Sequence, residues 1–207
     1  LYLEDVIKTD TSHINYVHQL SVGDRMILDT SCLRHLEITI NVRDGSKKGT
    51  LLDVLDKTLT PMGARMLKQW IEHPLMDIHR IVRRQMGIGE SIDNPTMRSQ
   101  LRSLLTSVYD FERILSRVET GSVSPRDFAS LRESLRVLPM IQDVLQHCTS
   151  NILQDCHSMI HTHDDLCDML TRAIVDQPSL ALKDGHVIRD GYSVELDELR
   201  SLATNSQ

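Results

Sequence analysis

The chain has 207 residues, which is enough for one or two domains with a hydrophobic core. Hydrophobic residues make up 40% of it but aromatic residues only 3%, so Leu, Ile, Val and Met must fill the core, a composition that argues against an all-β fold. The formal net charge of −6 argues against a domain that grips nucleic acid on its own, because such domains carry a basic face.

The first fifty residues carry weak structural signals. A short helix is possible over residues 3–7, and the run 24–29 has the composition of a short strand. Residues 41–49 are polar and contain glycine, which predicts an exposed loop. No signal peptide is recognisable, and no apolar run approaches the roughly 20 residues of a membrane helix. We therefore expect a cytoplasmic location and no membrane partner.

The rest of the chain contains clear sequence signals for the starts of helices. Five capping residues precede apolar stripes, and three of them are followed by proline at the first helical position: Thr60–Pro61, Asp77, Asn94–Pro95, Asp110 and Ser124–Pro125. Asp127 completes something close to a capping box with Ser124.

Helix ends are marked as well. Pro74 limits the first of these helices, and Gly121 ends the stripe that follows Asp110. Pro139 lies inside the long stripe after Ser124 and is expected to kink or split that helix. Further helices are predicted over about 166–174 and from Ser193 onward. The sequence therefore predicts an all-α, irregular helical bundle with at most a short β element near residues 24–29.

Motifs for catalysis are missing from the sequence. No segment has the Gly-x-x-x-x-Gly-Lys-Ser/Thr spacing that cradles nucleotide phosphates, so we expect no ATP site and no cofactor in these residues. The segment 148–167 is rich in Cys and His but has no second pair of ligands for structural zinc, which favours buried thiols and surface histidines over a metal site. No nucleophile elbow occurs, so we predict no catalytic residue.

Four arginine pairs lie along the predicted helices. Acidic residues lie among them, and mixed charge at helical spacing is typical of a solvated face. Contact with phosphates is therefore the less favoured interpretation of these pairs. The pairs are Arg83/Arg84, Arg98/Arg102, Arg113/Arg117 and Arg132/Arg136.

Several blocks of sequence follow one another in a recognisable order and spacing: 26–29, 36–38, 50–70, 73–75, 81–85, 110–117, 125–127, 187–192 and 195–200. Together these blocks resemble the core domain of the MutS family of mismatch-repair ATPases. One departure is His35, where bacterial members usually carry Asn. The residues that carry the resemblance, and that it marks as structural or coupling residues, are Leu28, Asp29, Leu36, Glu37, Thr60, Pro61, Met62, Gly63, Arg65 and Trp70.

Each residue of the 60–70 block also has a physical interpretation. Gly63 is expected to permit close packing in the first helical turn, and Arg65 to satisfy carbonyls or carboxylates at a domain contact. Trp70 is expected to be a large core anchor.

The resemblance implies a division into a helical core domain, residues 1–192, and the start of a lever helix, residues 193–207, leading to a clamp domain beyond Gln207. Such a segment is no enzyme by itself but couples an ATPase to mismatch binding and clamp closure. The parent protein would use ATP and Mg, bind mismatched double-stranded DNA as a homodimer, recruit a MutL-type partner and associate with a bacterial nucleoid. The opening residue, Leu1 rather than Met, also suggests a piece of a longer chain, and the helix Leu196–Leu202 should then expose an apolar strip.

Other functions remain open at this point. One is a helical scaffold in a MutS-related recombination protein that does not read mismatches, because the distinguishing residues would precede Leu1. Another is a free-standing helical adaptor. The least favoured is an enzyme that uses the Cys/His-rich segment.

Overall fold

The computed structural model describes residues 25–180 and 182–205, and in these ranges every regular element is a helix. The all-α prediction is confirmed. In place of a strand near residues 24–29, the described residues contain an isolated antiparallel bridge between Arg25 and Leu75. Asp24 and the possible helix at 3–7 lie outside the described residues.

Ten α-helices and one 3-10 helix follow one another along the described part of the chain. Their bounds are α2 Thr30–His35, α3 Leu51–Leu55, α4 Pro61–Glu72, α5 Ile78–Asp93, α6 Pro95–Leu105, α7 Phe111–Glu119, α8 Pro125–Gln146, α9 Asn151–Met159, α10 Asp164–Ala173, η1 Leu182–Asp184 and α11 Val194–Asn205.

The predicted capping residues begin their helices. The Thr60 hydroxyl accepts a hydrogen bond from the Gly63 amide at 3.1 Å, and Asp77, Asn94 and Asp110 cap α5, α6 and α7 in the same manner. Ser124 forms the complete capping box with Asp127 at the start of α8. Local side-chain chemistry therefore sets where these helices start.

Of the kink or split predicted at Pro139, the split is wrong, because α8 runs without interruption from Pro125 to Gln146. Proline removes one backbone hydrogen bond and crowds the preceding turn. The two halves of α8 are nevertheless held in place, by Leu135 in one buried cluster and by Ile141 and Leu145 in another. Burial on both sides of the proline outweighs its local cost.

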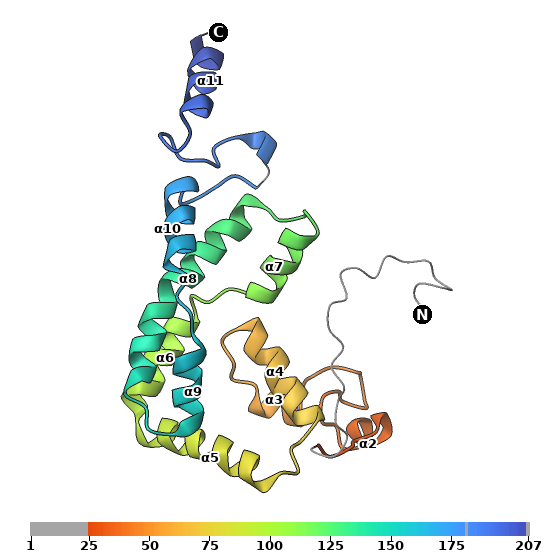
Figure 1. The fold of residues 1–207 in the computed structure, drawn as a ribbon. Coiled ribbons are helices and arrows are strands. Elements are labelled where there is room, and N and C mark those ends of the chain that lie inside the picture. Colours follow the sequence, from red (N-terminus) through yellow and green to blue (C-terminus); the bar gives the residue numbers. More distant parts are fainter. Residues whose placement is uncertain (1–24, 181, 206–207) are drawn as a thin grey trace, which may run out of the picture.

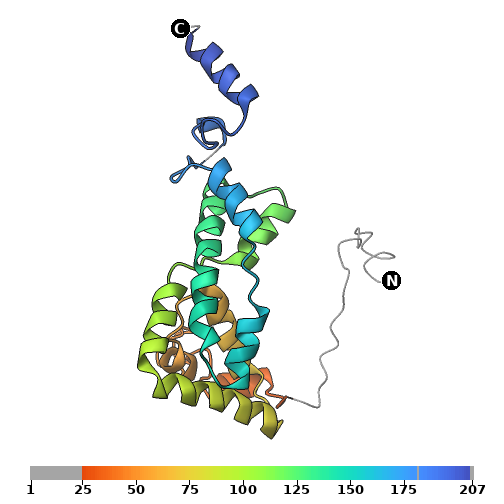
Figure 2. The same ribbon diagram turned by 60° about the vertical axis from the view of Figure 1, so that its left-hand side comes forward.

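Helix α8 is the spine of the molecule. Its 22 residues span about 33 Å and contact α6, α7, α9 and α10 (Figure 1). One core cluster joins α8 to α7, α10 and Val187, and the other joins it to α6 and α9. Helices α2, α3 and α4 lie beside this column at its lower end, and the turned view shows how elongated the column is (Figure 2).

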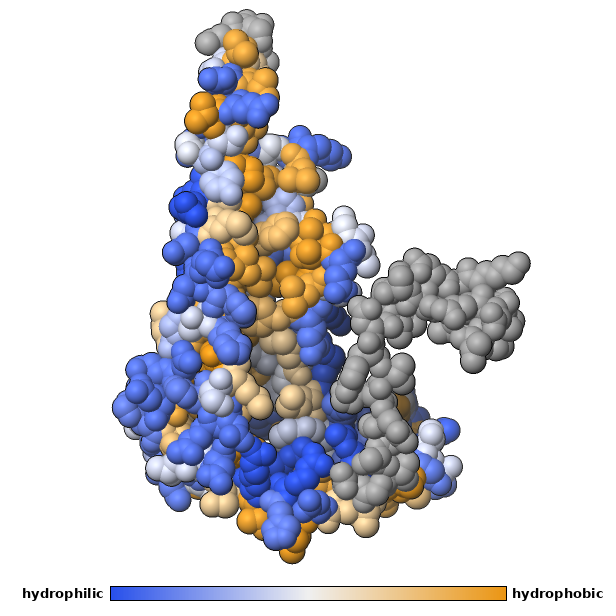
Figure 3. All heavy atoms as spheres, viewed as in Figure 1, coloured by the Kyte–Doolittle hydropathy of each residue, from blue (hydrophilic) through white to orange (hydrophobic). Residues whose placement is uncertain are grey.

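Helix α11 projects from the opposite end of the column (Figures 1 and 2). Leu199 and Leu202 are 58% and 66% exposed, so the expected apolar strip on this helix is confirmed. A second apolar surface follows α7 and the groove beside α8, where Phe111, Leu115 and Leu138 line a pocket (Figure 3). Among the described residues, no helix combines the length and apolarity that crossing a membrane requires.

Candidate coupling sites

Arg65 on α4 holds the start of α7. Its two terminal nitrogens each contact one oxygen of Asp110 at 2.7 Å, and its Nε donates to Glu112 at 3.0 Å (Nη2 also contacts Glu112). The predicted role of Arg65 as a partner of carboxylates is confirmed. Asp110 is also the N-cap of α7, so the same carboxylate that starts this helix ties it to α4.

The charge at this contact has a measurable consequence. The Arg65 guanidinium, helped by the Arg113 amide, holds the pKa of Asp110 below its ordinary value. Two parallel N–H···O bonds fix the orientation as well as the distance. This contact therefore fixes the start of α7 against α4.

We expect the ion pair of Arg65 with Asp110, which is bidentate, to contribute more to the free energy of unfolding than its ion pair with Glu112. Asp110→Asn keeps an oxygen that can cap α7 and removes the charge. Glu112→Gln also removes a charge, from a side chain that is 69% exposed and does not cap the helix. In double-mutant cycles with Arg65→Ala, measured by urea unfolding, the coupling to Asp110 should exceed the coupling to Glu112. Equal couplings would contradict the geometry.

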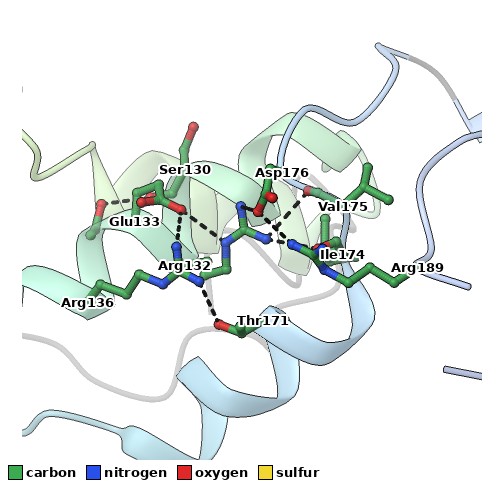
Figure 4. Close-up of polar contacts among 10 residues, drawn as sticks. Ser130, Arg132, Glu133, Arg136, Thr171, Ile174, Val175, Asp176 and Arg189 are labelled. Atoms are coloured by element: carbon green, nitrogen blue, oxygen red, sulfur yellow. Dashed lines mark hydrogen bonds and ion pairs between the residues drawn. The ribbon is translucent and has the colours of Figure 1, made fainter. Parts of the chain in front are cut away.

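Arg132 on α8 lies at the centre of a second polar contact (Figure 4). Its side chain is only 1% exposed. Its Nη1 donates to the Ile174 carbonyl at 2.9 Å, its Nε to Glu133 at 3.1 Å, and its Nη2 lies 3.3 Å from Asp176. The guanidinium is buried while both carboxylates reach the surface, an arrangement that keeps the desolvated charge paired.

Arg189 extends the contact toward the end of the chain. Its Nε donates to the Ile174 carbonyl at 2.9 Å and its Nη2 to Asp176 at 2.6 Å, so two arginines share both acceptors (Figure 4). Further on, Arg200 of α11 reaches back to Asp190 at 2.7 Å and to the Ile188 carbonyl at 3.0 Å. Hydrogen bonds therefore lead step by step from α8 to α11.

The solvated-face interpretation of the arginine pairs is wrong at Arg132. The other pairs are more exposed but several also bond within the chain: Arg98 donates to the Ser91 carbonyl and Arg102 to the Lys57 carbonyl. The position of Arg132 in the sequence already indicated its burial. It lies about 40° from Phe128 around the helix, well inside the apolar stripe.

A third contact joins α5 to the start of α9. The Glu90 carboxylate accepts hydrogen bonds from the Thr149 amide at 2.6 Å, the Thr149 hydroxyl at 3.1 Å and the Ser150 amide at 2.8 Å. The cap residue Ser150 makes no side-chain cap of its own, so Glu90 caps α9 from another helix. The Ser150 and Thr149 amides and the Thr149 hydroxyl lower the pKa of Glu90 to about 2.

This carboxylate predicts a defined pH dependence. Because the pKa of Glu90 is lowered on folding, its contribution is present above about pH 4.5 and is lost as the pH falls toward about 2. Glu90→Gln should lower the free energy of unfolding by about 1 kcal/mol at neutral pH. Measured by urea unfolding, the difference between wild type and variant should shrink between those two pH values. A difference that does not change with pH would contradict the assignment.

The remaining signature residues are spread over two regions. Asp29 caps α2 and accepts from the Cys32 amide at 2.6 Å, and Leu28 precedes it, half-buried. Glu37 has a positive φ of 48° and its carboxylate accepts from the Val42 amide at 2.9 Å, while Leu36 is 67% exposed. Leu28 and Asp29 thus stand at the start of α2, Leu36 and Glu37 stand at its end, and among the described residues no hydrogen bond joins any of them to the Arg65 contact.

The 60–70 block forms the N-cap and most of α4, and one of its predicted roles, that of Trp70, is wrong. Pro61 begins the helix, Met62 packs against the core cluster of α6, α8 and α9, and a Cβ on Gly63 would lie 2.9 Å from the Thr60 hydroxyl. Close packing at Gly63 is therefore confirmed. Trp70, expected as a core anchor, is 36% exposed.

The Cys/His-rich segment forms no cluster. Cys148 is buried, but Cys156 is exposed, so the prediction of buried thiols holds for the first and is wrong for the second. His161 and His163 are exposed, with ring centroids 6.2 Å apart. In the described ranges, no three His, Cys, Asp or Glu side chains converge as metal ligands would.

A column of helices joined end to end by polar contacts defines a helical scaffold. The family model of MutS domain III matches residues 31–206, and the chain belongs to the MutS family.

The similar proteins cover its full length. The chain is 40% identical over 206 residues to the DNA mismatch repair protein MutS of Symbiobacterium thermophilum, covering 100% of this chain and 24% of that protein. For the proteins of the same name from Caldanaerobacter subterraneus and Methanothrix thermoacetophila, identities are 39% and 40%, again over 100% of this chain and 24% of each relative. The chain thus spans about a quarter of the length of these relatives.

Proposed function

We propose that this chain is the helical core, residues 1–192, and the start of the lever helix, residues 193–207, of a mismatch-repair ATPase. Its role is to couple ATP hydrolysis to binding of mismatched DNA and to closure of a clamp. The parent protein would bind ATP and Mg outside these residues, form a homodimer, recruit a MutL-type partner and associate with a bacterial nucleoid. The segment itself would carry no catalytic residue.

The observation that carries this proposal is the continuity of contacts along the column. Arg65 ties α4 to α7, the core clusters tie α7 to α8, and Arg132, Arg189 and Arg200 tie α8 to α11. Coupling between distant sites needs a physically connected element that moves as a body. The relatives described above are all named for mismatch repair, which favours this role over recombination.

A chimera tests the proposal. This chain would replace the matching region of the Symbiobacterium thermophilum protein, and the mutation frequency of a mismatch-repair-deficient bacterium would be measured. We expect the chimera to lower the frequency as the intact relative does. We expect the chimera with Arg65→Ala to bind a mismatched duplex but to respond poorly to ATP, since α4 is then uncoupled from α7.

The matched control is Arg172→Ala, which removes an exposed arginine of α10 whose side chain makes no hydrogen bond or ion pair in the described residues. A folded chimera that leaves the mutation frequency at the deficient level would sink the proposal. Calorimetry of this chain alone with ATP should show no specific heat of binding, and tight binding would contradict the placement of the nucleotide site elsewhere.

A further inference from the structure

Arginines gather where α4, α5 and the segment around residue 25 meet. Arg80 and Arg84 are one turn apart on α5, and the bridge to Leu75 holds Arg25 beside them. Burial lowers the pKa of Arg84 below its ordinary value, and repulsion from Arg80 and Arg25 lowers it further.

The two half-buried members of this group differ from the other arginines that are shielded from solvent. Arg132, Arg189 and Arg200 are each bonded to a carboxylate and a backbone carbonyl. Within the described ranges, no hydrogen bond or ion pair engages the side chain of Arg25 or Arg84. Arg80 makes a contact of its own, so the inference rests on Arg25 and Arg84.

Trp70 orients Arg84 without using its hydrogen-bond donors. The guanidinium carbon lies 3.4 Å from the ring centroid, which is a stacked cation–π contact. The five N–H donors of a guanidinium lie in its plane, so stacking on one face leaves all of them available. The stack thus holds at a fixed position a cation that has no acceptor within residues 25–180 and 182–205.

Half-buried cations that repel one another and have no acceptor among the described residues are stabilised by an anion. Phosphate suits this group better than a single carboxylate, because it offers several acceptor oxygens to guanidinium groups approaching from different elements. We propose that Arg25, Arg80 and Arg84, positioned by Trp70, form a binding site for a phosphate group. The phosphate belongs either to a nucleic-acid backbone or to a free phosphate anion.

The site contains its own reporter, because Trp70 is the chain's single tryptophan. The whole chain would be titrated with inorganic phosphate, with a short fluorescein-labelled DNA duplex and with polyglutamate, while tryptophan fluorescence and label anisotropy are followed. We expect a saturable change with the duplex, with phosphate or with both. Saturation by the duplex alone identifies a backbone site, and saturation by phosphate at comparable affinity identifies a site for the free anion.

Arg25→Gln and Arg84→Gln should together weaken binding by about tenfold or more and reduce the salt dependence of duplex binding. Arg172→Gln makes the same charge change elsewhere and should weaken binding by no more than about twofold. Arg25→Gln alone leaves the Trp70 stack intact, so it remains informative if Arg84→Gln perturbs folding.

Three results would overturn the site: no saturable response to either phosphate ligand, an equal loss in Arg172→Gln, or an equal response to polyglutamate, which would indicate an acidic protein partner instead. These titrations involve no ATP, mismatch or chimera, so their failure is distinguishable from failure of the mismatch-repair role.

Discussion

Replacing Arg132 with alanine is expected to lower the free energy of unfolding by about 3 kcal/mol. The substitution empties a site that is 1% exposed and removes the bonds from α8 to the Ile174 carbonyl and Asp176. Arg132→Met, which keeps much of the volume but no charge, should cost less, because packing is preserved and no charge remains to be desolvated. Urea unfolding of the chain measures both differences.

Arg136 supplies the matched control, one turn further along α8. It is 40% exposed and contacts Glu133 and Thr171 at the surface (Figure 4). Arg136→Ala should cost about 0.5 kcal/mol, as exposed ion pairs generally do. Similar losses for the two alanine variants would show that burial of the Arg132 guanidinium does not stabilise the joint between α8 and α10.

The second large effect is expected at Gly87, where α5 crosses α9. A Cβ at this position would lie 2.5 Å from the Cγ2 atom of Ile152 and 3.9 Å from Leu153, so either the Ile152 side chain or the two helices must shift to admit it. Gly87→Ala should therefore lower the free energy of unfolding by about 1–3 kcal/mol, the usual cost of overpacking. The same shift should strain the bond between Glu90 and the start of α9.

Gly89 is the control, two residues along the same helix. A Cβ there would meet nothing within 4 Å. Gly89→Ala should stabilise the chain by about 0.5–1 kcal/mol, because alanine restricts the unfolded chain and favours helix. The same substitution should thus lower the stability at Gly87 and raise it at Gly89. Thermal unfolding of the two variants measures this difference. If both raised the melting temperature, the close approach of α5 and α9 would be contradicted.

Most helix starts followed from the sequence because their causes are local. The capping oxygen of Thr60 or Ser124 accepts from an amide three residues further on, so the neighbouring residues in the sequence suffice to predict the contact. The left-handed turn at Gly121, with φ of 67°, is local in the same sense. The all-α class followed from the periodicity of apolar residues, which is also a property of single segments.

Errors arose where distant segments decide the outcome. Pro139 remains inside α8 because two clusters hold the helix on either side, and no local pattern reveals both. Trp70 was expected in the core, but α4 turns it toward Arg84 near the surface. Each case depends on which faces of separate helices meet, which is a property of packing.

The sequence by itself determined the helical class, the principal caps and the resemblance to MutS, because each depends on residue order within short blocks. Only the tertiary structure decided which charges are joined. Arg65 and Asp110 are 45 residues apart, Arg132 and Ile174 are 42 apart, and Glu90 and Ser150 are 60 apart. Composition supplies many possible partners for each charge at such separations. The packing of α8 against its neighbours selects among them, because burial stabilises only the paired arrangement.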